Sequence, residues 1–198
     1  MRMSPDITDK LLSMVPKSGV LLDVGCGEGT FLRNLSGKGF TLIGVDPRYK
    51  DSCPEIKDEI RILYGTGEAI PCPSDYADCI VLQCVFSLCE PVKTIRETYR
   101  VLKKGGTLLV SDLYSEAGSC RTMESPLADR IDSREQLEGW FRKCFRQVGF
   151  YDETDALLVM LGQAVMDGES NACIAPADLQ RLKKVRARYG LWVWRKDP

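Results

Sequence analysis

The stretch LLDVGCGEGTFL, residues 21–32, joins an apolar run to an aspartate and three closely spaced glycines. The run around its start, residues 20–24, has the length and character of a strand buried in a sheet. Glycine at positions 25, 27 and 29 removes side chains where a ligand would lie against the backbone, and it permits positive φ angles. A helix beginning at Glu28 would add unpaired N–H groups. The stretch therefore predicts a ligand-binding turn between a strand and a helix.

Asp23 indicates which kind of ligand this turn would hold. A dinucleotide-binding turn has the pattern G-x-G-x-x-G, but position 30 is threonine and the pattern here is D-x-G-x-G-x-G. A carboxylate two residues before the first glycine disfavours a pyrophosphate as its neighbour. It favours a ligand that carries ammonium and sulfonium charges. The pattern therefore predicts S-adenosylmethionine (SAM) rather than NAD.

A second aspartate is expected beside the first. Asp46 ends the apolar segment IGVDP, and the carboxyl ends of neighbouring parallel strands meet at the same edge of a sheet. A carboxylate at this position can accept hydrogen bonds from both ribose hydroxyls, although NAD-binding folds use the same device. The predicted cofactor contacts in these two segments are Asp23, Gly25, Cys26, Gly27, Gly29, Asp46 and Pro47.

Length and composition limit the classes of protein that fit this chain. Its 198 residues, of which 44% are hydrophobic, suffice for one core, so a single domain over residues 1–198 is expected. The net charge of −1 gives no general attraction to nucleic acid or to anionic membranes. The N-terminus lacks a signal peptide's apolar segment, and no apolar run reaches the roughly 20 residues that span a bilayer. We expect a soluble cytoplasmic protein.

Nine cysteines and no histidine restrict the chemistry. The number of cysteines is odd and no CxxC motif occurs, so we expect mostly reduced, structural thiols. The absence of histidine removes the most common metal ligand and the most common general base at neutral pH. No metal site is predicted. The alternative is a thiol cluster of Cys84, Cys89 and Cys120, because soft metals and metalloids prefer thiolates.

Short apolar runs alternate with helical patterns along the chain, which is typical of a parallel sheet wrapped by helices. Strands are predicted over residues 20–24, 41–45, 61–64, 78–83, 107–112 and 190–195, with 150–154 as a candidate sixth strand before the last. Helices are predicted over residues 7–15 and from Glu28, Pro54, Pro91 and Ser133. Gly105-Gly106 and Gly149 are expected to end the last two of these helices.

Residues 155–188 interrupt the alternation of strands and helices. They are predicted to form two helices, 155–167 and 176–188, separated by the turn-rich segment GESNACIAP. The first is apolar over much of its surface and must be covered. Either this helical insertion caps a substrate site, or it buries the seam of a homodimer. We favour the cap.

Two further segments carry a family resemblance. GTGEAIPCPSDYADCIVLQ and RVLKKGGTLLVSD, taken with the glycine turn and Asp46, resemble the ordered motifs of the class I SAM-dependent methyltransferases. The chain is most similar to the type 11 subgroup, which includes quinone-biosynthesis methyltransferases. The resemblance covers residues 18–150 and the last strand, with Lys104 in place of the usual turn proline. It implies a Rossmann-like α/β fold with a mostly parallel seven-stranded sheet, order 3-2-1-4-5-7-6 and an antiparallel last strand. It also implies that Glu68 and Ala69 contact the adenine edge.

The same resemblance locates the substrate beyond the carboxyl ends of the fourth and fifth strands. Candidate catalytic residues there are Gln83, Cys84, Asp112 and Tyr114, and Gln83 is also a candidate cofactor contact. The implied reaction is methyl transfer from SAM to an unidentified small molecule, with S-adenosylhomocysteine as the product. Without histidine, a base must be Asp112, Tyr114, a cysteine or the ionised substrate itself.

Three alternative functions carry less weight. An NAD-binding oxidoreductase is disfavoured by the glycine pattern, and a non-catalytic or regulatory SAM-binding protein would share every cofactor residue. Nucleic-acid methylation is disfavoured because LQCVFSL replaces the proline-rich motif of amino-methylating DNA enzymes after the fourth strand. The basic run RLKKVRAR, residues 181–188, also has an apolar stripe. It is expected to form a helix whose cationic face is solvated rather than bound to nucleic acid.

Overall fold

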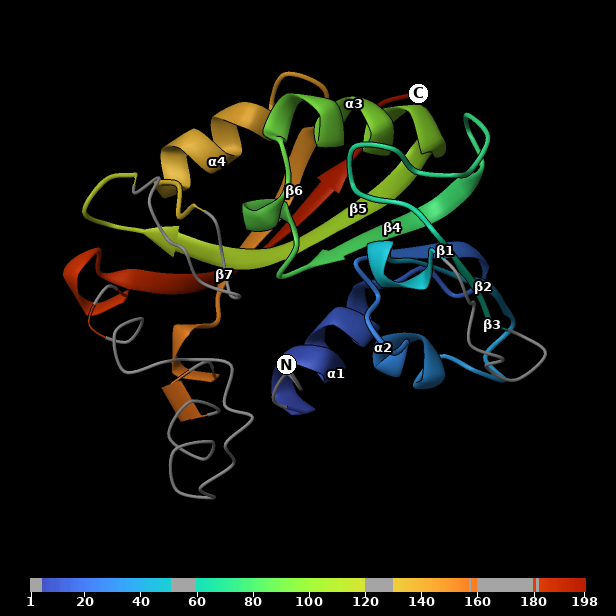
Figure 1. Cartoon of the computed structure of the whole chain (residues 1–198), viewed down its shortest axis with the longest axis horizontal. Coiled ribbons are helices and arrows are strands. Elements are labelled where there is room, and N and C mark those ends of the chain that lie inside the picture. The colour runs from blue at the N-terminus through green and yellow to red at the C-terminus, as the bar shows by residue number, and fades with distance from the viewer. Residues whose placement is uncertain (1–4, 51–59, 120–129, 157, 160–179, 181) are drawn as a thin grey trace.

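The computed structural model describes residues 5–50, 60–119, 130–156, 158–159, 180 and 182–198. Its strands form one seven-stranded sheet in the order β3-β2-β1-β4-β5-β7-β6 (Figure 1). They are β1 (Gly19–Val24), β2 (Phe40–Val45), β3 (Ile60–Leu63), β4 (Ala77–Gln83), β5 (Leu102–Ser115), β6 (Arg146–Asp152) and β7 (Ala187–Arg195). Neighbours from β3 to β5 pair in parallel, and β7 is antiparallel to both β5 and β6. The predicted strand order and the antiparallel last strand are confirmed.

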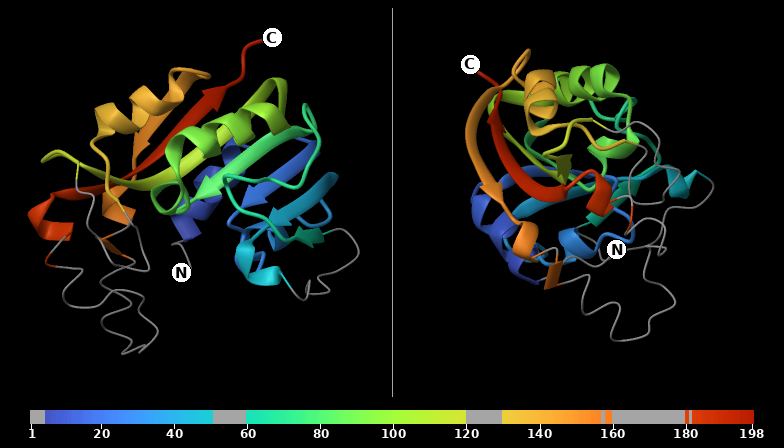
Figure 2. Two further views of the ribbon diagram at one scale, coloured as in Figure 1. Left: turned by 45° about the horizontal axis from the view of Figure 1, so that its top comes forward. Right: turned by 90° about the vertical axis from the view of Figure 1, so that its left-hand side faces the viewer.

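Helices cover both faces of the sheet (Figures 1 and 2). One layer consists of α1 (Pro5–Met14) and α2 (Thr30–Arg33), and the other of α3 (Pro91–Val101) and α4 (Arg134–Phe141). Successive residues of a strand point to opposite faces. Leu21 therefore packs with Ile7 and Leu32 in the core on the α1 side, whereas Leu22 packs in the core that includes Ile95 on the α3 side. Burial of both faces explains why the parallel strands are apolar almost throughout.

The helix after the glycine turn begins later than predicted. Gly29 is still in the left-handed region, with φ +73°, and α2 begins at Thr30 rather than at Glu28. Pro91 is the first residue of α3, as predicted. The helix predicted from Pro54 begins outside the described residues.

Two predicted helix ends are wrong. Gly105-Gly106 does not end α3, because α3 ends at Val101 and the glycine pair lies within β5. Gly149 does not end α4, because α4 ends at Phe141 and Gly149 lies within β6. The register of β6 against β7 shifts beside Gly149, and glycine inside a strand often marks such an irregularity. The sixth strand starts at residue 146 and ends at residue 152, so it begins before the predicted segment 150–154.

Only the ends of the predicted insertion, residues 155–188, belong to the described part of the chain. Ala156, Leu182 and Val185 pack against the core on the α1 side, in keeping with the apolar stripe of the second predicted helix. That helix ends before residue 187, because β7 begins there. The choice between a cap and a homodimer seam stays a prediction.

The cysteines in the described part of the chain are free thiols, namely Cys26, Cys72, Cys79, Cys84, Cys89 and Cys144. No group of cysteine, aspartate and glutamate side chains among the described residues is arranged to hold a metal ion. Cys120, the third member of the alternative thiol cluster, lies outside those residues. None of the helices described is long and apolar enough to cross a membrane.

Lys196 ties the end of the chain to the α3–β5 connection. It is 5% exposed, and its Nζ donates to the Tyr99 and Leu102 carbonyls at 2.8 and 2.7 Å. Lys196→Met is expected to lower the free energy of unfolding by about 1–3 kcal/mol, because these carbonyls lose a donor in a buried place. Urea denaturation measures the change. In the exposed control Lys17→Met, the free energy of unfolding should stay within about 0.5 kcal/mol of the parent chain's value. Equal effects in the two variants would contradict the prediction.

Candidate active site

The glycine turn follows β1 and packs closely against two other strand ends. Gly25, Gly27 and Gly29 have φ angles of +76°, +57° and +73°, which favour glycine at each position. The Gly25 N–H donates to the Val45 carbonyl at the end of β2 over 2.7 Å. A Cβ atom at Gly25 would lie 2.2 Å from Val85 Cγ2, in the segment after β4. The turn therefore leaves no room for a side chain at Gly25.

Two buried carboxylates lie beside this turn. Asp23 is 2% exposed and Asp46 is 6% exposed. Asp46 Oδ2 accepts from the Gly27 N–H at 2.8 Å, and its Oδ1 accepts from the Arg48 backbone N–H at 3.0 Å and Nε at 3.1 Å. Burial and the nearby charge of Asp46 raise the pKa of Asp23 to about 7. This edge of the sheet would therefore stabilise a ligand that carries positive charge.

Cys26 lies within the turn and Pro47 lies two residues after β2, and their predicted cofactor contacts stay predictions. Cys26 is 8% exposed, and burial is the main cause that raises the pKa of its thiol. A Cβ atom at Gly44 would lie 2.5 Å from Cys26 Sγ, so the small residue in β2 makes room for the thiol. Pro47 begins the short 3-10 helix η1 (Pro47–Tyr49), whose Tyr49 hydroxyl donates to the Gly27 carbonyl at 3.1 Å.

The predicted adenine segment is anchored to the segment that follows β4. Glu68 Oε1 accepts from the Glu90 N–H at 2.7 Å. Thr66 and Ala69 exchange backbone hydrogen bonds of 3.3 and 3.2 Å, so the Ala69 N–H is used within its own turn. The predicted adenine contacts of Glu68 and Ala69 stay predictions.

Gln83 and Cys84 end β4 beside the middle of β5. Gln83 is half-buried and pairs with Ser111, whose carbonyl accepts from the Cys84 N–H at 2.7 Å. Cys84 has φ +54°, which turns the chain out of the sheet. Its Sγ lies 3.2 Å from the Tyr189 hydroxyl of β7 and shares a hydrogen bond with it. Burial raises the pKa of Cys84 to about 12, so this thiol stays protonated at neutral pH.

Asp112 and Tyr114 of β5 are both engaged with neighbouring elements. Asp112 is 1% exposed and accepts from the Ser87 N–H at 2.8 Å, which fixes the short 3-10 helix η2 (Phe86–Leu88). Burial raises the pKa of Asp112 to about 6. The Tyr114 hydroxyl donates to Asp152 of β6 at 2.9 Å, and burial raises the pKa of this tyrosine to about 12. Their catalytic roles stay predictions.

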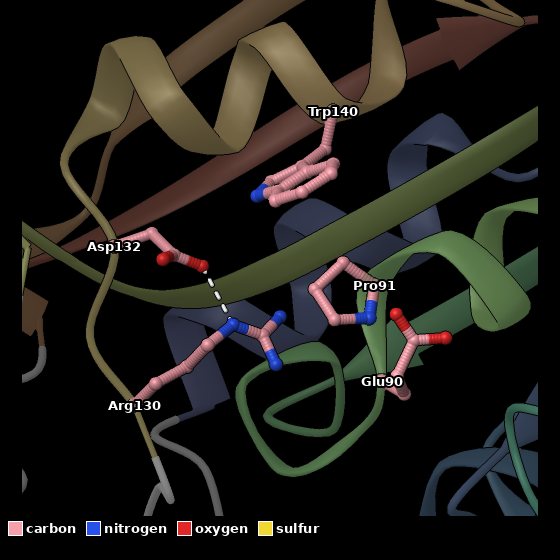
Figure 3. A pocket seen from close by; sticks show the side chains of 5 residues that line it. All are labelled: Glu90, Pro91, Arg130, Asp132 and Trp140. Carbon is pink, nitrogen blue, oxygen red and sulfur yellow. Dashed lines mark hydrogen bonds and ion pairs between the residues drawn. The ribbon is translucent and has the colours of Figure 1, made fainter. Parts of the chain in front are cut away.

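A pocket of about 350 Å³ lies between the start of α3, the segment before α4 and α4 itself (Figure 3). It is lined by Glu90, Pro91, Arg130, Asp132 and Trp140, none of which the sequence motifs place in a functional site. Arg130 donates to the carbonyls of Cys89 and Phe86, more than forty residues earlier in the chain. No local pattern in the sequence signals such a contact.

Comparisons with known proteins agree with the predicted family. The family described as "Methyltransferase domain" matches residues 22–110. An uncharacterized methyltransferase of Mycobacterium tuberculosis is 31% identical over 111 residues, which are 52% of this chain and 43% of that protein. The chloroplastic 2-methyl-6-phytyl-1,4-hydroquinone methyltransferase of Spinacia oleracea is 33% identical over 141 residues, 67% of this chain and 40% of that protein. The chain thus spans less than half the length of these relatives.

A solved structure agrees with the observed fold. The geranyl diphosphate C-methyltransferase of Streptomyces coelicolor A3(2), in complex with Mg²⁺, geranyl diphosphate and S-adenosyl-L-homocysteine, superposes with a TM-score of 0.78. The match covers 96% of this chain and 78% of that chain at 14% identity. At this identity the likeness concerns the fold alone.

Proposed function

We propose that this chain is a class I methyltransferase that transfers a methyl group from SAM to a small molecule. One observation carries the proposal. Asp23 and Asp46 are buried beside a turn whose backbone is bare of side chains. Two close carboxylates raise each other's free energy when ionised, and a cation lowers it. The sulfonium and ammonium groups of SAM would supply that charge, whereas a pyrophosphate would add to the repulsion.

The residues present fit this cofactor. Asp46 accepts hydrogen bonds through both oxygens, and the Nε donor of Arg48 belongs to a side chain that is 58% exposed. Ribose hydroxyls could therefore replace that donor, because the Arg48 side chain can turn into solvent when it leaves Asp46. Glu68 and Ala69 would lie at the adenine edge. The name of the spinach relative specifies a hydroquinone acceptor, which supports a small-molecule acceptor for this chain.

When bound, SAM supplies a methyl group that is already activated for in-line displacement by a nucleophile of the acceptor. The chain's own contribution is alignment and the exclusion of water. Cys84 and Tyr114, with pKa values raised to about 12, stay protonated at neutral pH. Both carboxylate oxygens of Asp112 accept backbone N–H groups, from Ser87 and Leu113. We therefore propose that none of these three groups acts as the base and that the acceptor supplies its own nucleophilic form.

Calorimetry with S-adenosylhomocysteine and NADH tests the proposal. We expect S-adenosylhomocysteine to bind and NADH not to bind. Asp46→Ala should weaken S-adenosylhomocysteine binding about 10–100-fold, the loss of about 1.5–3 kcal/mol typical of hydrogen bonds to a charged group. The exposed Asp197→Ala serves as the control and should bind like the parent chain. Tighter binding of NADH, or an unchanged affinity in Asp46→Ala, would refute this assignment. Radiolabelled SAM with a panel of small molecules would then identify the acceptor.

A further inference from the structure

The pocket between α3 and α4 contains polar atoms that lack partners within the described part of the chain. Trp140 Nε1 is buried and makes no hydrogen bond there. Asp132 is 4% exposed, and its Oδ2 accepts from Arg130 Nε at 2.7 Å, whereas no described residue donates to Oδ1. A buried N–H without an acceptor is costly, and it is satisfied by an occupant of the cavity when there is one. In Figure 3 the indole nitrogen is on the side of the ring that faces Asp132.

The other polar groups of the pocket are already in use. Arg130 is held by Asp132 and by the Cys89 and Phe86 carbonyls, so its charge is neutralised and its position is fixed. The Glu90 carboxylate accepts from two backbone N–H groups at the start of α3 and points away from Arg130 (Figure 3). Among the lining residues, an anionic occupant would therefore find no unpaired positive charge, and it would lie near two carboxylates. The two polar atoms that remain are Trp140 Nε1 and Asp132 Oδ1. They match an occupant that accepts one hydrogen bond and donates another.

The walls of the pocket indicate the shape of the occupant. The indole of Trp140 extends from α4 toward the Pro91 ring at the start of α3, with the Arg130 guanidinium beside them (Figure 3). Flat aromatic and ring surfaces pack best against planar molecules. A volume of about 350 Å³ is at the lower end of the range for small-molecule pockets, roughly 300–1,000 Å³.

From these observations we infer that this pocket binds a planar aromatic molecule bearing a hydroxyl or an amino group. The substituent accepts from Trp140 Nε1 and donates to Asp132 Oδ1, while its ring packs between Trp140 and Pro91. This inference goes beyond methyl transfer and holds whether or not the bound molecule is the acceptor. Because Arg130 also holds the η2 carbonyl of Phe86, an occupant would further fix the segment that follows Gln83 and Cys84.

The indole N–H resonances provide a direct test. The chain has three tryptophans, so a ¹⁵N-labelled sample gives one indole signal for each, and Trp140→Phe identifies that of Trp140. Titration with 2-naphthol should shift the Trp140 signal alone, because Trp192 Nε1 already donates to Glu138 and Trp194 is fully buried. 2-Methoxynaphthalene, which lacks the donor, should bind about 3–10-fold more weakly than 2-naphthol, as expected for one hydrogen bond. Naphthalene, which lacks both the donor and the acceptor, should bind more weakly still.

Variants and a parallel titration complete the test. Trp140→Phe keeps an aromatic wall but removes the N–H, and it should weaken 2-naphthol binding about 3–10-fold. The matched control Trp194→Phe removes a buried indole N–H outside the pocket and should leave affinity unchanged. Equal binding of naphthalene, or undiminished binding to Trp140→Phe, would overturn the inference. If S-adenosylhomocysteine binds and 2-naphthol does not, only this inference fails. The reverse result supports it and counts against the proposed function.

Discussion

Gly25→Ala is expected to lower the free energy of unfolding by about 2–5 kcal/mol and to weaken cofactor binding at least tenfold. The φ angle of +76° costs any residue with a Cβ atom about 1–2 kcal/mol. The added methyl would also overlap Val85 Cγ2 at 2.2 Å, and overpacking of this kind costs about 1–3 kcal/mol. Relief of the overlap must move the segment after β4, which follows Gln83 at the candidate active site. Denaturation in urea and calorimetry with S-adenosylhomocysteine measure the two effects.

A matched glycine separates the two causes. Gly39 has φ +82°, but a Cβ atom there would meet nothing within 4 Å. Gly39→Ala should therefore show only the conformational cost of about 1–2 kcal/mol and normal cofactor binding. Adding Val85→Ala to Gly25→Ala should recover the steric part of the loss, which appears as a coupling energy in a double-mutant cycle. If Gly25→Ala costs no more than Gly39→Ala, the close approach of Val85 has no energetic consequence.

The sequence predicted those parts of the molecule that depend on local patterns. The glycine turn, the aspartates before and after it, and the positions of most strands follow from short segments in which residue type and spacing carry the information. The family resemblance added the strand order and the antiparallel last strand, which no local pattern contains. The observed register agrees with the prediction that Asp23 and Asp46 meet at one edge of the sheet. Asp23 lies opposite Gly44 on β2, one residue pair before the two strands end, and Asp46 follows directly after β2.

Contacts between distant segments escaped prediction. Val85 against Gly25, Tyr189 against Cys84 and the pocket around Arg130 each join residues far apart in the chain. The same cause explains the wrong helix ends. Gly105-Gly106 resembles a helix stop, yet pairing of neighbouring residues with β4 and β7 makes it part of a strand. Tertiary pairing outweighs local propensity in such cases, and no propensity scale includes the distant partner.

The position of Asp23 could be predicted from the local sequence, but its pKa could not, because that pKa depends on burial and on the distant Asp46. A carboxyl whose pKa is raised from 3.8 to about 7 in the folded chain binds a proton on folding between these pH values. Stability therefore falls as pH rises through this window. A pKa raised this far lowers the free energy of unfolding by about 4 kcal/mol above pH 7. The ammonium group that SAM and S-adenosylhomocysteine share favours the ionised form when it lies beside Asp23, so cofactor affinity should change in the opposite direction and rise as pH increases toward 7.

Asp23→Asn should consequently separate stability from binding. The variant keeps the shape of the side chain but cannot ionise, so its advantage in free energy of unfolding over the parent chain should grow from near zero at pH 4 to about 4 kcal/mol at pH 8. Its affinity for S-adenosylhomocysteine should be weaker than that of the parent chain at pH 8 and nearly independent of pH. The parent's affinity should rise by up to about tenfold per pH unit between pH 5.5 and 7.

Urea denaturation and calorimetry between pH 4 and 8 provide both profiles, and calorimetry in buffers of different ionisation enthalpy detects the proton released when ligand binds near pH 6.5. The exposed Asp9→Asn is the control and should follow the parent chain in both measurements. Parallel stability profiles for Asp23→Asn and the parent would show that folding leaves the pKa of Asp23 unchanged, so that the carboxylate is ionised above about pH 5. In that case the affinity for a cation could not depend on its titration, and the buried carboxylate would stabilise the ligand by its fixed charge alone.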